Sequence, residues 1–336
     1  MNASAKTATL AAPPALRALT ESSGIPVSRL EAVLRAGHFA VTAEMSPPDS
    51  CDAADVYERV QALDGWVDAI NATDASGANV HISSLAVCVL LRQAGYCPVM
   101  QISCRDRNRI AIQGDVLGAA ALGIANILCL TGDGVQTGDH PETKPVFDFD
   151  SISLLRALRT LRDERTFMSG RALSAAPRIF LGAAENPSSP PVQMRVMRLQ
   201  RKIEAGAQFV QTQYCFDLPK LIEFMTQVQD LGLDRKAYIL AGIGPLASAG
   251  AARWMRSHVP GIHIPDDLVR RLEQSDKPKD EGRRICIELM QRIKDIPGIA
   301  GVHVMAFKQE RFVGDMIASA GILGGRKPQS HRIGAS

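Results

Sequence analysis

Short hydrophobic runs alternate with amphipathic stretches along almost the whole chain. Eight of these runs are apolar on both faces, which is typical of parallel strands covered on each side. Polar or turn-forming residues follow each run, as expected where a strand ends. We therefore predict eight strands, over Phe39–Glu44, Trp66–Asn71, Pro98–Cys104, Asn126–Thr131, Arg178–Ala184, Gln208–Gln213, Ala237–Ala241 and Gly301–Ala306.

The stretches between these strands carry hydrophobic residues at helical spacing. Leu221, Phe224 and Val228, for example, fall on one stripe with the period of about 3.6 residues that an amphipathic helix requires. A further helix is expected before the first strand, because Ser28 and Glu31 have the spacing of a capping box ahead of an apolar stripe. Strands and helices therefore alternate from the first strand to the last.

Eight strand–helix units without a break in composition predict an α/β fold, a closed (β/α)8 barrel of the TIM type, for which about 250 residues is usual. The surplus length falls in the extra amino-terminal helix and in a helical insertion between strands 7 and 8, where Pro265–Leu272 and Glu281–Lys294 have helical patterns. We predict one catalytic barrel over residues 28–322, a disordered tail over 1–27 and a flexible tail over 323–336. A doubly wound open sheet is the competing architecture, but no Gly-x-Gly-x-x-Gly follows any predicted strand.

The charge of the chain is nearly balanced. Its 38 basic and 35 acidic residues are interspersed and leave a formal net charge of +3. This distribution creates no strong field, so we expect neither nucleic acid nor a membrane as a partner. No apolar run approaches the roughly 20 residues that a membrane-spanning helix needs.

The seven cysteines form an odd set without a Cys-x-x-Cys pair, which argues against a disulfide framework and a structural zinc site. A reducing compartment, the cytoplasm, is therefore expected. The first twenty residues contain no acid and are rich in Ala, Thr and Ser, which is faintly similar to an organelle transit peptide. The rarity of basic residues and the Pro13-Pro14 pair favour a plain tail instead.

Barrel enzymes carry their chemistry at the carboxyl ends of the strands, so the polar residues that end the predicted strands are the candidates. Glu44 ends an apolar strand just before Pro47-Pro48. Desolvation favours the protonated carboxyl group and so suits a proton donor, although Glu44 could also be a charge near the start of the next helix. Asp133 lies between Gly132 and Gly134, which let the backbone approach a ligand closely, but this motif is also typical of a plain turn.

Further polar side chains follow strands five and six. Arg198, Arg201 and Lys202 could hold a diphosphate, since guanidinium groups bind phosphate in a bidentate manner, or could form a solvated helix face. Alternation places Gln211 and Gln213 on one side of strand six, where amides suit a planar heterocycle or have a purely structural role. The polar loop after strand four lacks the spacing of metal ligands, so no metal is predicted.

Four segments resemble motifs of the methylenetetrahydrofolate reductase family, in the family's order. Ala43–Pro48 (Ala-Glu-Met-Ser-Pro-Pro) resembles the family's Glu-Phe-(Phe/Ser)-Pro-Pro, and Leu130–Asp133 (Leu-Thr-Gly-Asp) resembles its Leu-Arg-Gly-Asp. Arg201–Ala207 resembles Arg-Lys-x-x-Ala-Gly-Ala, and Thr212–Asp217 resembles Thr-Gln-Phe-Phe-Phe-Asp. The resemblance runs from about residue 39 to residue 320, and the set is specific although no single motif decides it.

The resemblance implies a flavin-dependent enzyme that interconverts methylenetetrahydrofolate and 5-methyltetrahydrofolate. FAD, or FMN, would lie across the carboxyl end of the barrel, with NADH or NADPH as electron donor. Glu44 would be the general acid that opens the five-membered ring of the folate, and Asp133 would stabilise the cation that forms. Gln213, with Phe216 beside it, would bind the pterin. Lys202 and its neighbour at position 201 would bind the flavin phosphates.

Four positions that face the flavin in the resembling enzymes carry other residues here. Thr131 precedes Gly132 where many members have arginine, and Gln101 stands in place of histidine. Ala184 replaces a tyrosine, and Arg198 replaces a common asparagine. Gly132 and Asp133, which would lie near the flavin pyrimidine, complete the predicted cofactor-binding set. The four departures leave both flavin affinity and the choice between FAD and FMN open.

The segments 131–148 and 182–187 resemble a divergent branch of the family from the one-carbon metabolism of acetogens and methyl-group degraders. Some of those enzymes work with a separate electron-transfer subunit, so such a partner is an alternative to a nicotinamide donor. The resemblance further implies a homo-oligomer and a place in methionine biosynthesis. Because the chain ends near residue 336, we expect it to lack the adenosylmethionine-binding regulatory domain that follows the barrel in eukaryotic members.

Two other functions remain open. The altered flavin positions are compatible with a flavin-free barrel that transfers a methyl group from folate to a corrinoid protein. A non-catalytic subunit of a folate or electron-transfer complex is the other alternative, although binding alone does not require the acid at Glu44.

Overall fold

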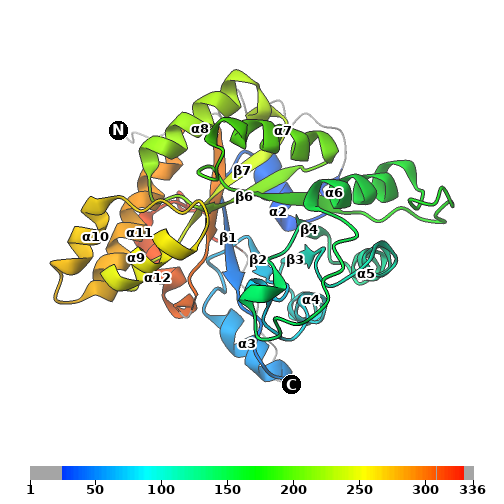
Figure 1. Cartoon of the computed structure of the whole chain (residues 1–336), viewed down its shortest axis with the longest axis horizontal. Helices are drawn as coiled ribbons and strands as arrows, with labels where there is room; N and C mark the ends of the chain where they lie inside the picture. The colour runs from blue at the N-terminus through cyan, green and yellow to red at the C-terminus, as the bar shows by residue number, and fades with distance from the viewer. Residues whose placement is uncertain (1–24, 308, 329–336) are drawn as a thin grey trace, which may run out of the picture.

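Eight parallel strands close into a barrel in which each strand pairs with its neighbours in sequence and β1 pairs with β8 (Figure 1). The computed structural model describes residues 25–307 and 309–328, so most of both predicted tails lies outside the described residues. The predicted (β/α)8 barrel is confirmed. Its strands are β1 (Ala40–Met45), β2 (Ala69–Ala72), β3 (Pro98–Ser103), β4 (Asn126–Leu130), β5 (Phe180–Glu185), β6 (Phe209–Tyr214), β7 (Tyr238–Ile243) and β8 (Ile299–Val304).

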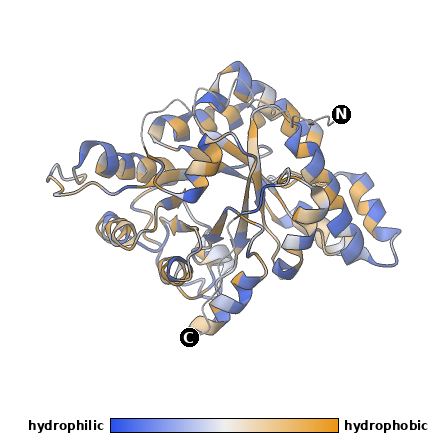
Figure 2. Ribbon diagram, turned by 180° about the vertical axis from the view of Figure 1, so that it is seen from behind, coloured by the Kyte–Doolittle hydropathy of each residue, from blue (hydrophilic) through white to orange (hydrophobic). Residues whose placement is uncertain are grey.

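Helices surround the barrel and turn their hydrophobic faces towards it, while hydrophilic residues gather on their outer faces (Figure 2). Most of them begin at a side chain that accepts a hydrogen bond from the first turn, for example Asn108 and Asp150. The helices are α2 (Arg29–Arg35), α3 (Ala53–Gln61), α4 (Ser84–Gln93), α5 (Arg109–Ala121), α6 (Ser151–Arg159), α7 (Arg195–Ala205), α8 (Leu218–Asp230), α9 (Ala249–His258), α10 (Asp266–Glu273), α11 (Pro278–Lys294) and α12 (Val313–Ala320).

Helix α2 closes the amino-terminal end of the barrel. Ser28 caps it by accepting a hydrogen bond from the Glu31 amide at 3.1 Å, which confirms the predicted start of this helix. The Glu31 carboxylate accepts from the amide of Val27, so the capping box is only half formed. Leu30 and Leu34 are buried among strand residues inside the barrel, namely Ala40, Ala69, Val99, Leu128, Phe180, Phe209, Tyr238, Leu240 and Ala300.

The segment between β7 and β8 differs from the prediction. Helix α11 packs against both of these strands, so it is the regular helix of the seventh unit and not an extra one. The extra helices are α10, which was predicted, and α9, which was not. The buried face of α9 consists of Ala249 and Ala252. Because small alanines give little hydrophobic periodicity, the pattern did not reveal this helix.

The interior of the barrel changes from apolar to polar towards the carboxyl ends of the strands. Alternate residues of a strand point to the same side, so Ala40, Thr42 and Glu44 lie at successive levels of β1. The lowest level is hydrophobic and includes the residues that pack on α2. The next level is polar although it is buried, and it consists of Thr42, Asn71, Gln101, Gln211 and His303.

An ion pair fixes the end of the long loop between β4 and α6. The Asp148 carboxylate accepts hydrogen bonds from the backbone amide of Arg109 at 2.9 Å and from its guanidinium at 2.8 and 2.6 Å. Arg109 is the first residue of α5, so the contact ties the loop to the start of that helix. The hydrogen bonds from Arg109 lower the pKa of Asp148 to about 2.

We expect the Asp148 carboxyl group to titrate at about pH 2 in carbon-detected NMR. Because this pKa lies below the unfolded value of about 3.9, the contact stabilises the fold fully above that value and is lost as the pH falls through 2. Asp148→Asn should therefore speed amide hydrogen exchange across residues 134–148 at neutral pH. Glu142→Gln, an exposed change in the same loop, is the control, and equal exchange in both variants would contradict the role of the ion pair.

Candidate active site

A cavity of about 440 Å³ opens at the carboxyl ends of the strands. Its volume lies within the range of about 300–1,000 Å³ that is usual for small-molecule sites, and its position is where barrel enzymes carry their chemistry. Residues from six strands, from α7 and from the segments that follow β5 and β8 line it. They are Glu44, Gln101, Leu128, Leu130, Ala184, Glu185, Asn186, Ser189, Arg198, Lys202, Gln211, Thr212, Gln213, His303 and Met305.

Two polar groups approach one oxygen of the Glu44 carboxylate. The Gln101 amide donates to Oε2 at 3.3 Å, and His303 Nε2 lies 3.8 Å from the same atom. The Glu44 side chain is 29% exposed, whereas that of His303 is 4% exposed. The surroundings of Glu44 are thus more polar than the apolar rim expected from the sequence, and groups from β3 and β8 orient its carboxylate at the cavity.

A buried hydrogen-bond network supports His303 from below. The Gln211 amide donates to Thr42 Oγ1 and to Asn71 Oδ1, each at 3.0 Å, and Asn71 donates back to Gln211 at 2.7 Å. Both amide protons of Gln211 are therefore used, and Thr42 accepts one of them. The hydroxyl proton of Thr42 is left for His303 Nδ1 at 3.0 Å, which is closer than the carbonyl of Val302 at 3.4 Å.

The shorter of the two Thr42 contacts favours one tautomer of neutral His303. With Nδ1 accepting from Thr42, the ring proton lies on Nε2, the nitrogen that faces Glu44. This tautomer aims an N–H group at the carboxylate from 3.8 Å. His303 can therefore help to orient Glu44.

A carboxylate and two cations form the other side of the cavity. The Glu185 side chain is 2% exposed and accepts from Lys202 Nζ at 2.9 Å. Arg198 Nε lies 3.7 Å from the second oxygen of the same carboxylate. Lys202 also donates to the carbonyl of Ala184 at 2.6 Å. Positive charge therefore faces the cavity, but an acid of this chain already accompanies it.

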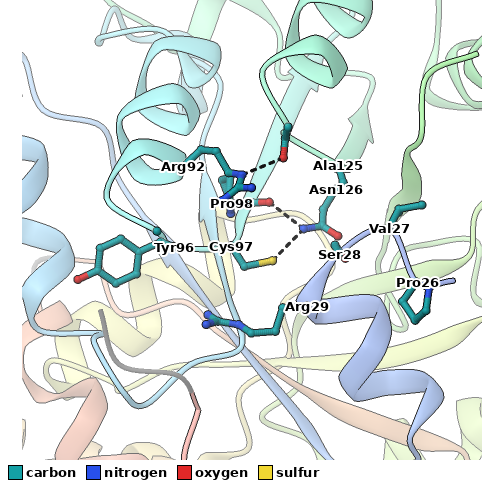
Figure 3. A pocket seen from close by; sticks show the side chains of 12 residues that line it. Pro26, Val27, Ser28, Arg29, Arg92, Tyr96, Cys97, Pro98, Ala125 and Asn126 are labelled. Carbon is teal, nitrogen blue, oxygen red and sulfur yellow. Dashed lines mark hydrogen bonds between the residues drawn. The ribbon is translucent and has the colours of Figure 1, made fainter. Parts of the chain in front are cut away.

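A second cavity, of about 320 Å³, lies at the opposite end of the barrel (Figure 3). Its polar side chains make contacts within the fold. Arg92 Nε donates to the carbonyl of Gly123 at 3.2 Å, and the Asn126 amide donates to the carbonyl of Pro98 and to Cys97 Sγ. These contacts secure the turns that lead into β3 and β4. The cavity at the carboxyl ends is therefore the candidate active site.

Residues 25–307 and 309–328 contain neither a cluster of metal ligands nor a membrane-spanning helix. No three His, Cys, Asp or Glu side chains in these ranges lie together as metal ligands would. No helix in them is long and apolar enough to cross a membrane.

Comparison with protein families decides the relationship of the chain. The model of the family described as methylenetetrahydrofolate reductase matches residues 29–321, which include the whole barrel. The chain belongs to the methylenetetrahydrofolate reductase family.

Individual relatives are distant. A probable methylenetetrahydrofolate reductase (NADPH) of Caenorhabditis elegans is 24% identical over 306 residues, which cover 88% of this chain and 44% of that protein. A 5,10-methylenetetrahydrofolate reductase of Pectobacterium carotovorum is 23% identical over 274 residues, covering 80% of this chain and 85% of that one. The chain thus spans less than half the length of the eukaryotic relatives it matches.

A solved structure with the same fold is an uncharacterized protein from Clostridium thermocellum that binds two copies of 5-methyl-5,6,7,8-tetrahydrofolic acid. The TM-score is 0.57 at 14% identity, over 84% of this chain and 94% of that one. At this identity the similarity supports the barrel fold and no more.

The structure brings together six of the residues that the methylenetetrahydrofolate reductase resemblance singled out. All six line the cavity at the carboxyl ends of the strands. Gln211 lines it as well, on the same side of β6 as Gln213, which confirms the alternation expected there. The six are Glu44, Gln101, Ala184, Arg198, Lys202 and Gln213.

Three further predicted positions follow β4 and lie on the rim, outside the lining of the cavity. The exposed Asp133 accepts a hydrogen bond from the amide of Gly77 at 2.9 Å and so joins the loops after β4 and β2. Thr131 Oγ1 accepts from the amide of Ser151, the first residue of α6. Gly132 has a φ of +99°, a conformation that favours glycine.

Two predicted side chains point elsewhere. Arg201 is exposed on α7 and does not line the cavity, although its neighbour Lys202 does. Phe216 is 2% exposed and stacks on Tyr214, with ring centroids 5.4 Å apart, in the hydrophobic layer outside the strands. A direct contact of either side chain with a ligand in the cavity would require it to move.

Sequence reasoning missed His303, Thr42 and Glu185. The sequence held a signal for the first two. Thr42 lies two positions before Glu44 and so points to the same side of β1, and His303 is a polar residue within the apolar strand β8. Glu185 follows Ala184 at the end of β5. Its pairing with Lys202 depends on how α7 packs, which no local pattern specifies.

Proposed function

We propose that this chain is a flavin-dependent 5,10-methylenetetrahydrofolate reductase that interconverts methylenetetrahydrofolate and 5-methyltetrahydrofolate. The observation that carries the proposal is the carboxylate of Glu44 at the mouth of the barrel, oriented by Gln101 and His303. Membership of the family supports it.

The residues of the cavity fit a flavin, with FAD as the first choice and FMN as the alternative. Arg198 and Lys202 would face the phosphate groups, and the amide of Gln101 would face the polar edge of the ring system. An apolar floor completes the site, formed by Leu128, Leu130 and Met305. We propose this lining as the cofactor site, joined at the rim by the turn at Thr131 and Gly132.

The bound flavin would supply the hydride that converts the folate's bridging carbon into a methyl group. Glu44 would first give its proton to the ring nitrogen that leaves this carbon, which opens the five-membered ring to an iminium ion. The carboxylate left on Glu44 and that of Asp133 would then stabilise the positive charge on the folate. Gln213 would hold the pterin, since its amide both donates and accepts hydrogen bonds.

His303 would act as a positioning residue for Glu44. Replacement of His303 by Asn should lower the rate of the folate half-reaction about tenfold and shift its pH profile, while reduction of the flavin by the donor stays unchanged. Thr42→Val removes the hydroxyl that contacts His303 Nδ1 and should act in the same direction with a smaller effect. An unaltered pH profile in both variants would rule out this role.

The proposal is tested by an absorbance spectrum of the purified chain with added FAD or FMN, followed by anaerobic addition of 5-methyltetrahydrofolate. We expect a bound flavin whose absorbance bleaches as it takes up the hydride. The proposal would be overturned if the chain bound no flavin and no bleaching occurred. Methyl transfer from folate to a corrinoid in the absence of flavin would then support the methyltransferase alternative.

We also propose a nicotinamide donor, a homo-oligomer and a cytoplasmic location. The relative from Caenorhabditis elegans carries NADPH in its name, which supports the first of these. All seven cysteines are free, as in a reducing compartment. The donor is tested by comparing reaction rates with NADH and NADPH, and the oligomeric state by measuring the mass in solution. A stable complex with an electron-transfer subunit would favour that subunit as the donor in place of a nicotinamide.

A further inference from the structure

We propose that Glu185 competes with the flavin phosphates for Arg198 and Lys202, so that it keeps flavin binding weak and exchangeable. This inference rests on the proposed function for the identity of the ligand. The competition itself concerns any phosphate group at these two cations.

The Glu185 carboxylate is buried, and both of its oxygens have partners within the protein. Its side chain is 2% exposed, at the end of β5. One oxygen accepts from Lys202 Nζ at 2.9 Å, and the other accepts from the amide of Asn186 at 3.0 Å and lies 3.7 Å from Arg198 Nε. The carboxylate therefore already provides the negative charge that a phosphate would bring.

The charges of the cavity cancel. The charged side chains that line it are two acids, Glu44 and Glu185, and two bases, Arg198 and Lys202. A phosphate must either displace Glu185 from Lys202 or place its own charge beside a buried carboxylate. Both routes cost free energy, because a buried charge that loses its partner or gains a like-charged neighbour is poorly solvated.

About half of the hydrogen-bond donors of the two cations are also engaged. Lys202 Nζ donates to the Ala184 carbonyl and to Glu185. Arg198 donates through its two Nη atoms to the carbonyls of Ser189 at 2.9 Å and Pro191 at 3.4 Å. Loss of the charge at Glu185 would free Lys202 for an external anion and leave its other contact in place.

Glu185→Gln tests the inference, with Glu204→Gln as the matched control. Glu204 is exposed on α7 and accepts a hydrogen bond from Gln200, so its replacement removes the same formal charge from the helix that carries Arg198 and Lys202. Dissociation constants are measured by calorimetry for FAD, FMN, riboflavin and inorganic pyrophosphate. We expect Glu185→Gln to bind FAD, FMN and pyrophosphate at least tenfold more tightly than wild type, to bind riboflavin equally well, and Glu204→Gln to match wild type throughout.

The outcomes separate this inference from the proposed function. Unchanged affinity for FMN and pyrophosphate in Glu185→Gln would overturn the inference, and so would an equal gain for riboflavin, which has no phosphate. Tighter pyrophosphate binding without any flavin binding would support the competition and reject the flavin. Should circular dichroism show that Glu185→Gln is unfolded, Glu185→Ala makes the same test.

Discussion

Replacement of Glu44 by Gln is expected to slow the folate half-reaction by about a hundredfold to ten-thousandfold, the usual contribution of a general acid. Glutamine keeps the shape of the side chain and can still accept the hydrogen bond from Gln101, but it has no proton to give to the ring nitrogen. Reduction of the flavin by the donor needs no such proton and should proceed at the wild-type rate. Stopped-flow absorbance follows both half-reactions separately.

The control for Glu44→Gln is again Glu204→Gln, which removes an exposed carboxylate outside the cavity. It should leave both half-reactions unchanged. Wild-type folate turnover in Glu44→Gln would refute the acid role. Loss of both half-reactions in that variant would show instead that Glu44 is needed to bind the flavin.

Replacement of Gly282 by Ala is expected to destabilise the fold by about 3 kcal/mol, the upper end of the range for overpacking. A Cβ at this position would lie 1.7 Å from the carbonyl oxygen of Leu246, in the segment that follows β7. The neighbour is backbone and not the end of a flexible side chain, so helix α11 must shift to make room. The free energy of unfolding from urea titration measures the loss.

Gly118→Ala is the matched control for this change. Gly118 also lies within a helix, α5, but a Cβ there would meet nothing within 4 Å. Alanine should therefore stabilise the protein by about 0.5–1 kcal/mol through helix propensity. Equal unfolding midpoints for the two variants would mean that α11 does not pack as closely as the structure indicates. Because α11 contacts β8, such a result would also weaken the placement of His303.

Two of the departures from the common family residues have direct structural consequences at the cavity. Gln101, in place of a histidine, donates to the Glu44 carboxylate. Ala184, in place of a tyrosine, brings only a methyl group to the lining at the end of β5. The Gln101 side chain is therefore used for a contact within the protein, and Ala184 leaves out an aromatic ring.

The sequence by itself determined the eight strands, the closed barrel and the place of Glu44 at its mouth. These features follow from local patterns, because a buried parallel strand reads as a short apolar run and its carboxyl end is marked by the polar residue that closes it. The helix at Ser28 was predictable for the same reason, since a cap and the stripe that follows it are neighbours in sequence.

Only the tertiary structure decided which polar groups meet. Closure of the barrel pairs β1 with β8 and brings Thr42 within 3.0 Å of His303, although 261 positions separate them in sequence. The packing of α7 turns Lys202 towards Glu185 and leaves Arg201 in solvent. Contacts of this kind depend on the register and angle of elements that are distant along the chain. The local sequence therefore showed which charges were available, and the packing of the barrel selected the pairs.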